Sequence, residues 1–198
     1  MFSLRKPSEA RIIQYLLDQR DQPFSYEEVG ITRFGSASGY ITDHERVTLG
    51  HGADVFASAK DAVMKWKMFP EEMVELFWPD KPIEVGVVVA FLARGAGLWT
   101  LNPCRIVYLI DGQDDDVHRF GFAYGTLPDH LARGEERFCV EWNRETDEVV
   151  YDLLALSRPQ HPLAWLGYPI VRRAQARFRR LSGQSLCNAI GRSAVTLA

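Results

Sequence analysis

The chain has 198 residues, of which 46% are hydrophobic and 25% charged, which is typical of a folded domain and excludes a disordered chain. Its net charge of -3 gives no overall reason to expect nucleic acid or an anionic membrane as partner, and no apolar run approaches the ~20 residues of a membrane-spanning helix. The three cysteines are far apart and form no CxxC pair, which favours reduced thiols in the cytoplasm over a disulfide framework or a zinc site.

The first forty residues are predicted to form a helix and an arm. Ser8 is suited to an N-cap, and apolar residues recur at helical spacing from Ser8 to Gln19. The segment that follows, 24–40, is rich in glycine and serine, which is typical of a connector. We therefore separate residues 1–40, as an N-terminal helix and arm, from a main domain.

One strand and two helices are expected next. Alternating apolar residues predict a strand at His44–His51, and an apolar face at helical spacing predicts a helix at Ala53–Phe69. Pro70 is suited to the start of a second, short helix with the sequence EEMVELFW, at 71–78, which Pro79 would end.

From Ile83 onward the hydrophobic period changes to two, which predicts five consecutive strands. Short connections join them, so we expect neighbouring strands to pair as antiparallel hairpins. The predicted strands are Ile83–Ala93, Leu98–Ile110, Val117–Thr126, Glu135–Trp142 and Glu148–Ser157.

A long helix is predicted to close the domain, with Pro169 in its first turn. Its apolar stripe consists of Ile170, Ala174, Phe178 and Leu181. After Gly183 we expect a loosely held tail. The chain is thus divided into residues 1–40, a main domain at 41–182 and a tail at 183–198.

This order of elements predicts an α+β fold of the helix-grip type. A curled antiparallel sheet of about 6–7 strands with one apolar face needs a cover, and the C-terminal helix is placed to provide it. In such a fold the sheet grips the helix and a cavity lies between them. The alternative is an α+β sheet that packs solidly and leaves no cavity.

Strand alternation predicts which side chains face the interior. In Glu135–Trp142 and Val117–Thr126 the even positions are mostly large and apolar, so both even sets face inward. The odd positions between Arg119 and Gly125 are small, which suits a close neighbour or a bulge. Glu136 then faces inward and needs either a polar partner or a place at the solvent-exposed opening of a cavity. The alternative is a strand that starts later and leaves Glu136 in solvent.

The predicted ligand site is built around Glu136. Its candidate partners are Tyr124, Thr126, His130 and Arg158. Inward aromatic residues supply the bulk of the wall, namely Trp66, Trp99, Phe120, Phe122, Tyr124, Phe138 and Trp142. The ligand-binding set we predict is Trp66, Phe122, Tyr124, Thr126, His130, Glu136, Phe138 and Arg158. The same aromatic residues would equally form a core without a void.

Several separate motifs resemble those of a known family. They are GFAYGTLPDH and GEERF within 121–138, NPCR at 102–105, LGHG at 49–52 and SRPQHPLAWLGYP at 157–169. In this order they resemble the bacterial and plant family of the domain of unknown function 1990, or uncharacterised protein family 0548, from about Tyr26 to Leu181. The resemblance further implies a START-like helix-grip protein. Such proteins typically hold lipids, hormones or polyketides in an apolar cavity, and a minority catalyse reactions there.

We therefore expect a cytoplasmic protein that binds a small apolar or amphipathic molecule between the sheet and the C-terminal helix. No motif indicates a cofactor, a metal site, a GxSxG nucleophile or a nucleic-acid partner. One alternative is an enzyme that uses Tyr124, His130 and Glu136 for acid–base chemistry.

A second alternative is an interaction module. The C-terminal helix carries Arg172, Arg173, Arg177, Arg179 and Arg180, a basic face that an acidic partner or an anionic surface would suit. A solvated helix face near the helix C-terminus would account for the same arginines.

Overall fold

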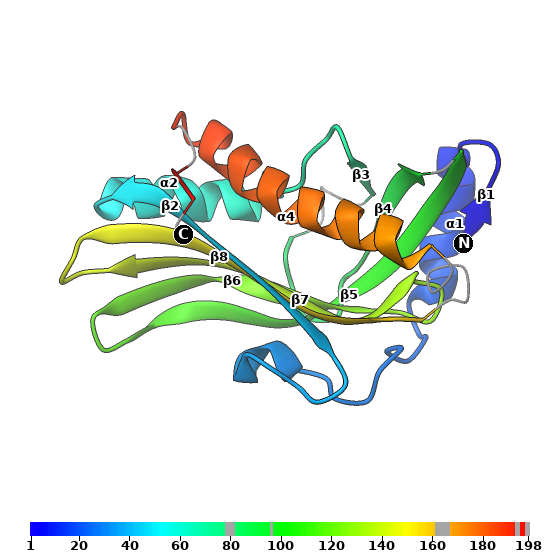
Figure 1. Ribbon diagram of the computed structural model, residues 1–198, viewed down its shortest axis with the longest axis horizontal. Coiled ribbons are helices and arrows are strands. Elements are labelled where there is room, and N and C mark those ends of the chain that lie inside the picture. Colours follow the sequence, from blue (N-terminus) through cyan, green and yellow to red (C-terminus); the bar gives the residue numbers. More distant parts are fainter. Residues whose placement is uncertain (78–81, 96, 161–166, 193–194, 197–198) are drawn as a thin grey trace.

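The computed structural model describes residues 1–77, 82–95, 97–160, 167–192 and the backbone of 195–196. An antiparallel sheet curls around two helices, α2 (Ala53–Met64) and α4 (Tyr168–Ala189), which lie on its concave face (Figure 1). The predicted α+β helix-grip class is confirmed. Across the described residues, no helix is both long and apolar enough to cross a membrane.

In the part of the chain that the structure describes, the sheet has nine strands, and every strand pair is antiparallel. Their order is β3-β4-β5-β6-β7-β8-β2-β9, and β1 pairs with β5 outside this path. The long strands are β2 (Ile41–His51), β4 (Val88–Gly95), β5 (Leu98–Asp114), β6 (Val117–Thr126), β7 (Ala132–Asn143) and β8 (Glu148–Pro159). The short ones are β1 (Phe2–Ser3), β3 (Val74–Phe77) and β9 (Val195–Thr196). The predicted five-strand meander is confirmed, although its first strand begins at Val88 and not at Ile83.

The helix predicted at 71–78 is wrong in the part that the structure describes. Residues Val74–Phe77 form β3, which pairs with β4 from Val74↔Ala93 to Phe77↔Ala90. The backbone N–H groups of Met73 and Val74 both donate to the Pro70 carbonyl, so Pro70 begins a turn. A run of four residues is too short for its hydrophobic period to distinguish a strand from a helix. Pairing with β4 makes this segment a strand. Trp78 and Pro79 fall among the residues that are not described.

The preceding helix, α2, is shorter than predicted and ends at Met64 instead of Phe69. Trp66 has a φ of 58°, in the left-handed region that a bulky side chain rarely adopts, so the helix cannot continue through it. The chain turns there and brings Phe69 onto the concave face of the sheet.

Helix α4 contacts the sheet with a different face from the one predicted. Its fully buried residues are Ser182, Gly183, Leu186 and Cys187, whereas Ile170 is 63% exposed. A Cβ atom on Gly183 would lie 2.7 Å from Val47 Cγ2, so the glycine allows the helix to approach β2 closely. The loose tail expected from Gly183 onward is therefore wrong as far as Ala189, because this stretch anchors the helix.

The N-terminal segments pack on the sheet as well. Helix α1 (Glu9–Gln19) is capped by Ser8, as predicted, and buries Ile12 and Leu16 against β4. The arm at 24–40, with the 3-10 turn η1 (Ile31–Phe34), covers the convex face, opposite α4 (Figure 1). A Cβ atom on Gly125 would collide with the Tyr26 hydroxyl, so the close neighbour expected beside the small odd positions is the arm.

Candidate functional site

A cluster of aromatic rings fills the space between the sheet and α4. Phe69 lies at its centre, with ring centroids 4.8 Å from Phe91, 5.4 Å from Phe138 and 5.8 Å from Phe178. Trp66 packs edge-on against Phe122 at 5.0 Å. The predicted wall residues Trp66, Phe122, Tyr124 and Phe138 are all buried within this cluster. Phe69, which was predicted only as the last residue of a helix, connects them.

Tyr124 and Glu136 form the polar part of this cluster. They are directly opposite each other on β6 and β7, and the Tyr124 hydroxyl donates a hydrogen bond to the Glu136 carboxylate. The predicted inward direction of Glu136 is confirmed, and the alternative of a late strand start is wrong because β7 begins at Ala132. Burial raises the pKa of Glu136 to about 7, although the Tyr124 hydrogen bond and the positive charge of Arg179 pull it down.

Asp43 lies in the same row of the sheet, since Glu136 pairs with Ala155 and Ala155 pairs with Asp43. Its carboxylate accepts a hydrogen bond from Arg172 Nη2 at 2.6 Å and forms an ion pair with Arg179 Nη2 at 3.0 Å, both from α4. Two of the five arginines predicted for an interaction surface therefore face the sheet. A third, Arg177, pairs with Glu72 at 2.8 Å.

Thr126, His130 and Arg158 do not join the Tyr124–Glu136 pair. The Thr126 hydroxyl lies 2.6 Å from that of Ser25, in the arm, and accepts the Gly134 N–H at 2.9 Å. His130 Nδ1 accepts the Ala132 N–H at 3.0 Å inside its own turn, and burial lowers its pKa to about 4. The Arg158 guanidinium lies 4.7 Å from the centre of the Tyr40 ring, so it too serves the arm.

The other aromatic residues proposed for the wall are spread over the molecule. Trp142 packs near Phe56 at 6.0 Å, under α2. Lys60 lies over Phe120 at 4.3 Å, and Trp99 faces Arg94 at 5.6 Å. Among the described residues, no group of three or more His, Cys, Asp or Glu side chains is placed to hold a metal ion.

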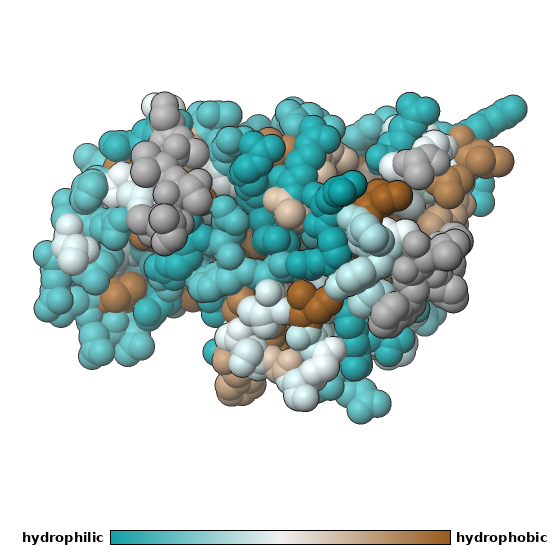
Figure 2. Space-filling model, viewed as in Figure 1, coloured by the Kyte–Doolittle hydropathy of each residue, from teal (hydrophilic) through white to brown (hydrophobic). Residues whose placement is uncertain are grey.

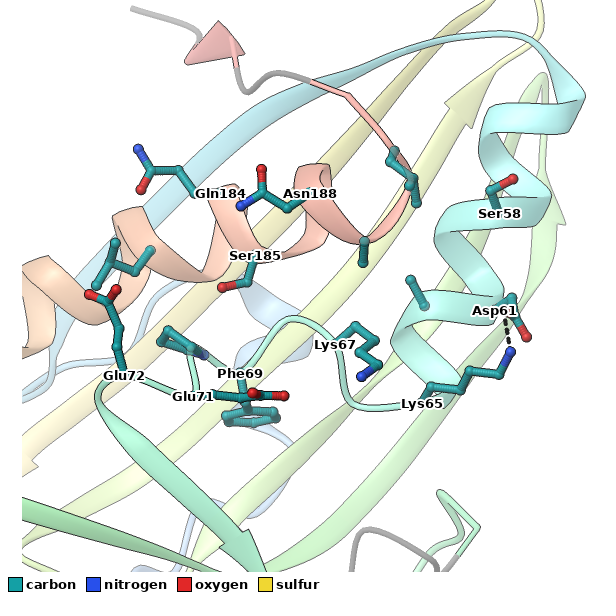
Figure 3. A pocket seen from close by; sticks show the side chains of 15 residues that line it. Ser58, Asp61, Lys65, Lys67, Phe69, Glu71, Glu72, Gln184, Ser185 and Asn188 are labelled. Carbon is teal, nitrogen blue, oxygen red and sulfur yellow. Dashed lines mark hydrogen bonds and ion pairs between the residues drawn. The ribbon is translucent and has the colours of Figure 1, made fainter.

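Two cavities adjoin along one flank of α4. The larger, of about 930 Å³, lies between the C-terminal half of α4, the end of α2 and the segment 65–72. Figure 3 shows Lys67, Phe69 and Glu71 on one side of it and Gln184, Ser185 and Asn188 on the other. The smaller, of about 450 Å³, lies between the N-terminal half of α4 and strands β3 and β4. Both include Glu71 and Glu72, and we call them together the α4 furrow.

None of the eight predicted ligand-binding residues lines either part of the α4 furrow. The link between the furrow and the predicted site is Phe69, which lines the larger cavity and lies 6.5 Å from the Tyr124 ring. Three of the four residues of the stripe predicted on α4 line the furrow: Ile170 and Ala174 line the smaller cavity and Leu181 the larger. The fourth, Phe178, packs against the core.

Sequence reasoning also missed Glu135, which is 2% exposed on the convex face. Its carboxylate accepts hydrogen bonds from the Tyr26 hydroxyl and the Gly30 N–H, each at 2.7 Å, and from the N–H and hydroxyl of Thr32. Strand alternation predicted only that the odd positions of this strand, Glu135 among them, do not face inward. The signal for this site was the arm sequence itself, which brings tyrosine, threonine and glycine to that face.

Comparison with known proteins identifies the family. A family model described as "Domain of unknown function (DUF1990)" matches residues 25–185. A UPF0548 protein of Dictyostelium discoideum is 36% identical, over 96% of this chain and 96% of that one. A UPF0548 protein of Deinococcus radiodurans is 34% identical, over 96% of this chain and 100% of that one.

A solved structure supports the fold. The hypothetical protein jhp0584 of Helicobacter pylori has a TM-score of 0.50 and 11% identity, over 84% of this chain and 95% of that one, which concerns the fold alone. Human STARD10 has a TM-score of 0.41 and 8% identity, over 90% of this chain and 80% of that one. By its sequence, the chain belongs to the DUF1990 family, whose curated relatives carry the description UPF0548.

Proposed function

We propose that the protein binds a small amphipathic molecule in the α4 furrow. The observation that supports this proposal is that three apolar residues of α4, Ile170, Ala174 and Leu181, line the furrow, and Ile170 is 63% exposed. The larger cavity, about 930 Å³, lies within the range of roughly 300–1,000 Å³ that small-molecule sites occupy. Covering exposed apolar surface gains about 25 cal/mol per Å². A ligand with an apolar part would therefore be stabilised along these residues.

The lining favours a molecule with both apolar and polar parts. Phe69, Leu181 and Ile190 contribute apolar surface to the larger cavity. Gln184 and Asn188 contribute amide groups on the same helix flank, where they would orient a ligand through hydrogen bonds.

Phe69 separates the furrow from the Tyr124–Glu136 pair. A rotation of its ring would open a path from the larger cavity to that pair, which would then bind the polar end of the ligand. On this proposal Tyr124 and Glu136 remain ligand-binding residues, with Trp66, Phe122 and Phe138 as the wall behind them. Thr126, His130 and Arg158 would support the site indirectly, by holding the turn after β6 and the arm at 24–40 in place.

The same pair supports an enzyme as the second candidate. A carboxyl group whose pKa lies at about 7 is poised to exchange a proton near neutral pH. A binding protein with Glu136→Gln would keep its ligand with altered affinity, whereas an acid–base enzyme would lose turnover of that ligand.

The proposal is tested by native mass spectrometry of the purified protein and by titration with N-phenyl-1-naphthylamine, a neutral apolar fluorescent probe. Ser185→Trp would fill the larger cavity, because Ser185 points into it (Figure 3). Ala176→Trp is the matched control, since Ala176 is exposed on α4 and lines neither cavity. We expect the wild type and the control to bind the probe and Ser185→Trp to lose it. Equal binding by all three would contradict the proposal.

A further inference from the structure

We propose that the ligand carries an anionic group, a carboxylate or a phosphate, and that Arg94 and Arg173 bind this group in the smaller cavity of the α4 furrow. This inference rests on the proposed function and specifies its ligand. It places the polar end of the molecule near the start of α4 and the apolar part along the stripe.

The charges of the smaller cavity carry the inference. Of its carboxylates, Glu72 pairs with Arg177 at 2.8 Å and Glu75 pairs with Lys6 at 2.7 Å. Within the described part of the chain, neither Arg94 nor Arg173 has a carboxylate partner. Arg94 instead lies 5.6 Å from the centre of the Trp99 ring.

Among the residues that the structure describes, this leaves two unpaired guanidinium groups around the smaller cavity, against a single unpaired carboxylate, Glu71, at its junction with the larger one. Guanidinium groups bind carboxylates and phosphates through two parallel hydrogen bonds, which makes arginine the side chain best suited to such anions. The smaller cavity is therefore complementary to an anion.

The larger cavity has no excess of positive charge. Its acidic side chains are Asp61, Glu71 and Glu72, and its basic ones are Lys65 and Lys67. Lys65 is already paired with Asp61 at 2.7 Å. Glu72 is paired with Arg177, so Glu71 and Lys67 remain and their charges balance. An anionic group finds an excess of positive charge only in the smaller cavity, so the two parts of the furrow distinguish the ends of an amphipathic anion.

The floor of the smaller cavity suits the adjoining apolar part. It includes Leu92, which is 1% exposed, together with Val74, Ile170 and Ala174. Figure 2 shows a hydrophobic patch beside the N-terminal half of α4, bordered by hydrophilic surface. From there the stripe leads past the Arg177–Glu72 pair to Leu181. That pair is 56% and 59% exposed, so separating it costs little.

The experiment compares amphiphiles that share one chain. Decanoate, decyl phosphate, decanol and decyltrimethylammonium are titrated into the full chain by isothermal calorimetry, below their micelle concentrations. We expect at least one of the two anions to bind about tenfold more tightly than decanol and the cation to bind more weakly than decanol. Comparison of decanoate with decyl phosphate shows which anionic group the site prefers.

Two variants locate the anionic group. Arg94→Gln and Arg173→Gln each remove one guanidinium from an exposed side chain and should lower the affinity for the anion about tenfold, with decanol unchanged. Arg180→Gln, an exposed arginine of α4 outside both cavities, is the control and should change neither affinity.

The outcomes separate this inference from the proposed function. If decanol and both anions bind equally, or if Arg94→Gln and Arg173→Gln both keep the preference for the anion, the anion site is wrong while the furrow remains a binding site. If no amphiphile binds, the proposed function fails and this inference fails with it.

Discussion

The Tyr124 hydroxyl donates a hydrogen bond to the Glu136 carboxylate from the directly opposite position of the neighbouring strand. The strand ladder itself therefore sets the geometry of the pair, and no loop needs to close around it. A carboxyl group fixed in this way among aromatic rings has a proton affinity that depends on the integrity of the fold.

Glu136→Gln should change the pH dependence of stability. The folded chain holds the Glu136 proton up to about pH 7, whereas its ordinary pKa is 4.5, so the folded state binds more protons than the unfolded state between these values. The contribution of Glu136 to the free energy of unfolding therefore falls as pH rises from about 4.5 to about 7. Glutamine keeps an acceptor for Tyr124 and carries no charge. We expect the variant to gain about 2 kcal/mol over wild type between pH 5 and pH 8, a value that allows for partial exposure of the side chain.

Urea unfolding of both proteins at pH 5, 6, 7 and 8 measures this gain. His130, whose pKa is lowered to about 4, destabilises the fold as pH falls, but it is present in both proteins and cancels in the difference. Glu145→Gln, in an exposed turn, is the control. A difference that stays constant with pH would contradict the burial of Glu136.

Two truncations on α4 should separate its structural face from its furrow face. Leu186→Ala removes a fully buried side chain and should cost about 3 kcal/mol of unfolding free energy. Ile170→Ala, at a 63% exposed position, should change stability by less than about 0.5 kcal/mol. It should nevertheless weaken binding of N-phenyl-1-naphthylamine several-fold. Loss of stability in Ile170→Ala would mean that the stripe packs on the protein itself.

Glu135→Ala should release the arm at 24–40. The substitution leaves the Tyr26 hydroxyl and the Thr32 N–H without their acceptor, at a cost of about 3 kcal/mol. Faster hydrogen exchange and proteolysis within the arm would report the release. Gly125→Ala is an independent route to the same result, because its Cβ would displace Tyr26. An arm that stays protected in both variants would show that Glu135 does not hold it.

Asp43→Asn should loosen only the N-terminal half of α4. Its carboxylate holds Arg172 and Arg179, while Leu186 and Cys187 anchor the other half in the core. We expect faster hydrogen exchange at 168–179 with little change at 182–187, and a loss of about 2 kcal/mol. Arg180→Gln is the matched control. Uniform protection along the helix would contradict this division.

The meander and the inward face of its strands could be predicted because both depend on local alternation. Short connections force neighbouring strands to pair, and the pairing then places Glu136 opposite Tyr124. The class of fold followed from the order of the elements.

The predictions from sequence were wrong where the local structure depends on residues that are far away in the chain. The stretch Val74–Phe77 is a strand because β4 offers an edge to pair with. The predicted sheet-facing side of α4 was wrong because the side that faces the sheet carries Arg172 and Arg179. Asp43, more than a hundred residues away in the chain, neutralises both. Three of the partners expected for Glu136 are instead held by the arm or by their own turn, as the contact of Thr126 with Ser25 illustrates.

The adjacent glutamates of β7 have a further consequence. Glu135 meets Tyr26 on the convex face and Glu136 meets Tyr124 on the concave face. A slip of β7 by one residue would exchange the faces, so that at most one of the two carboxylates would still meet a tyrosine. The native register of β7 is the one in which both glutamates have a tyrosine donor, one on each face of the sheet.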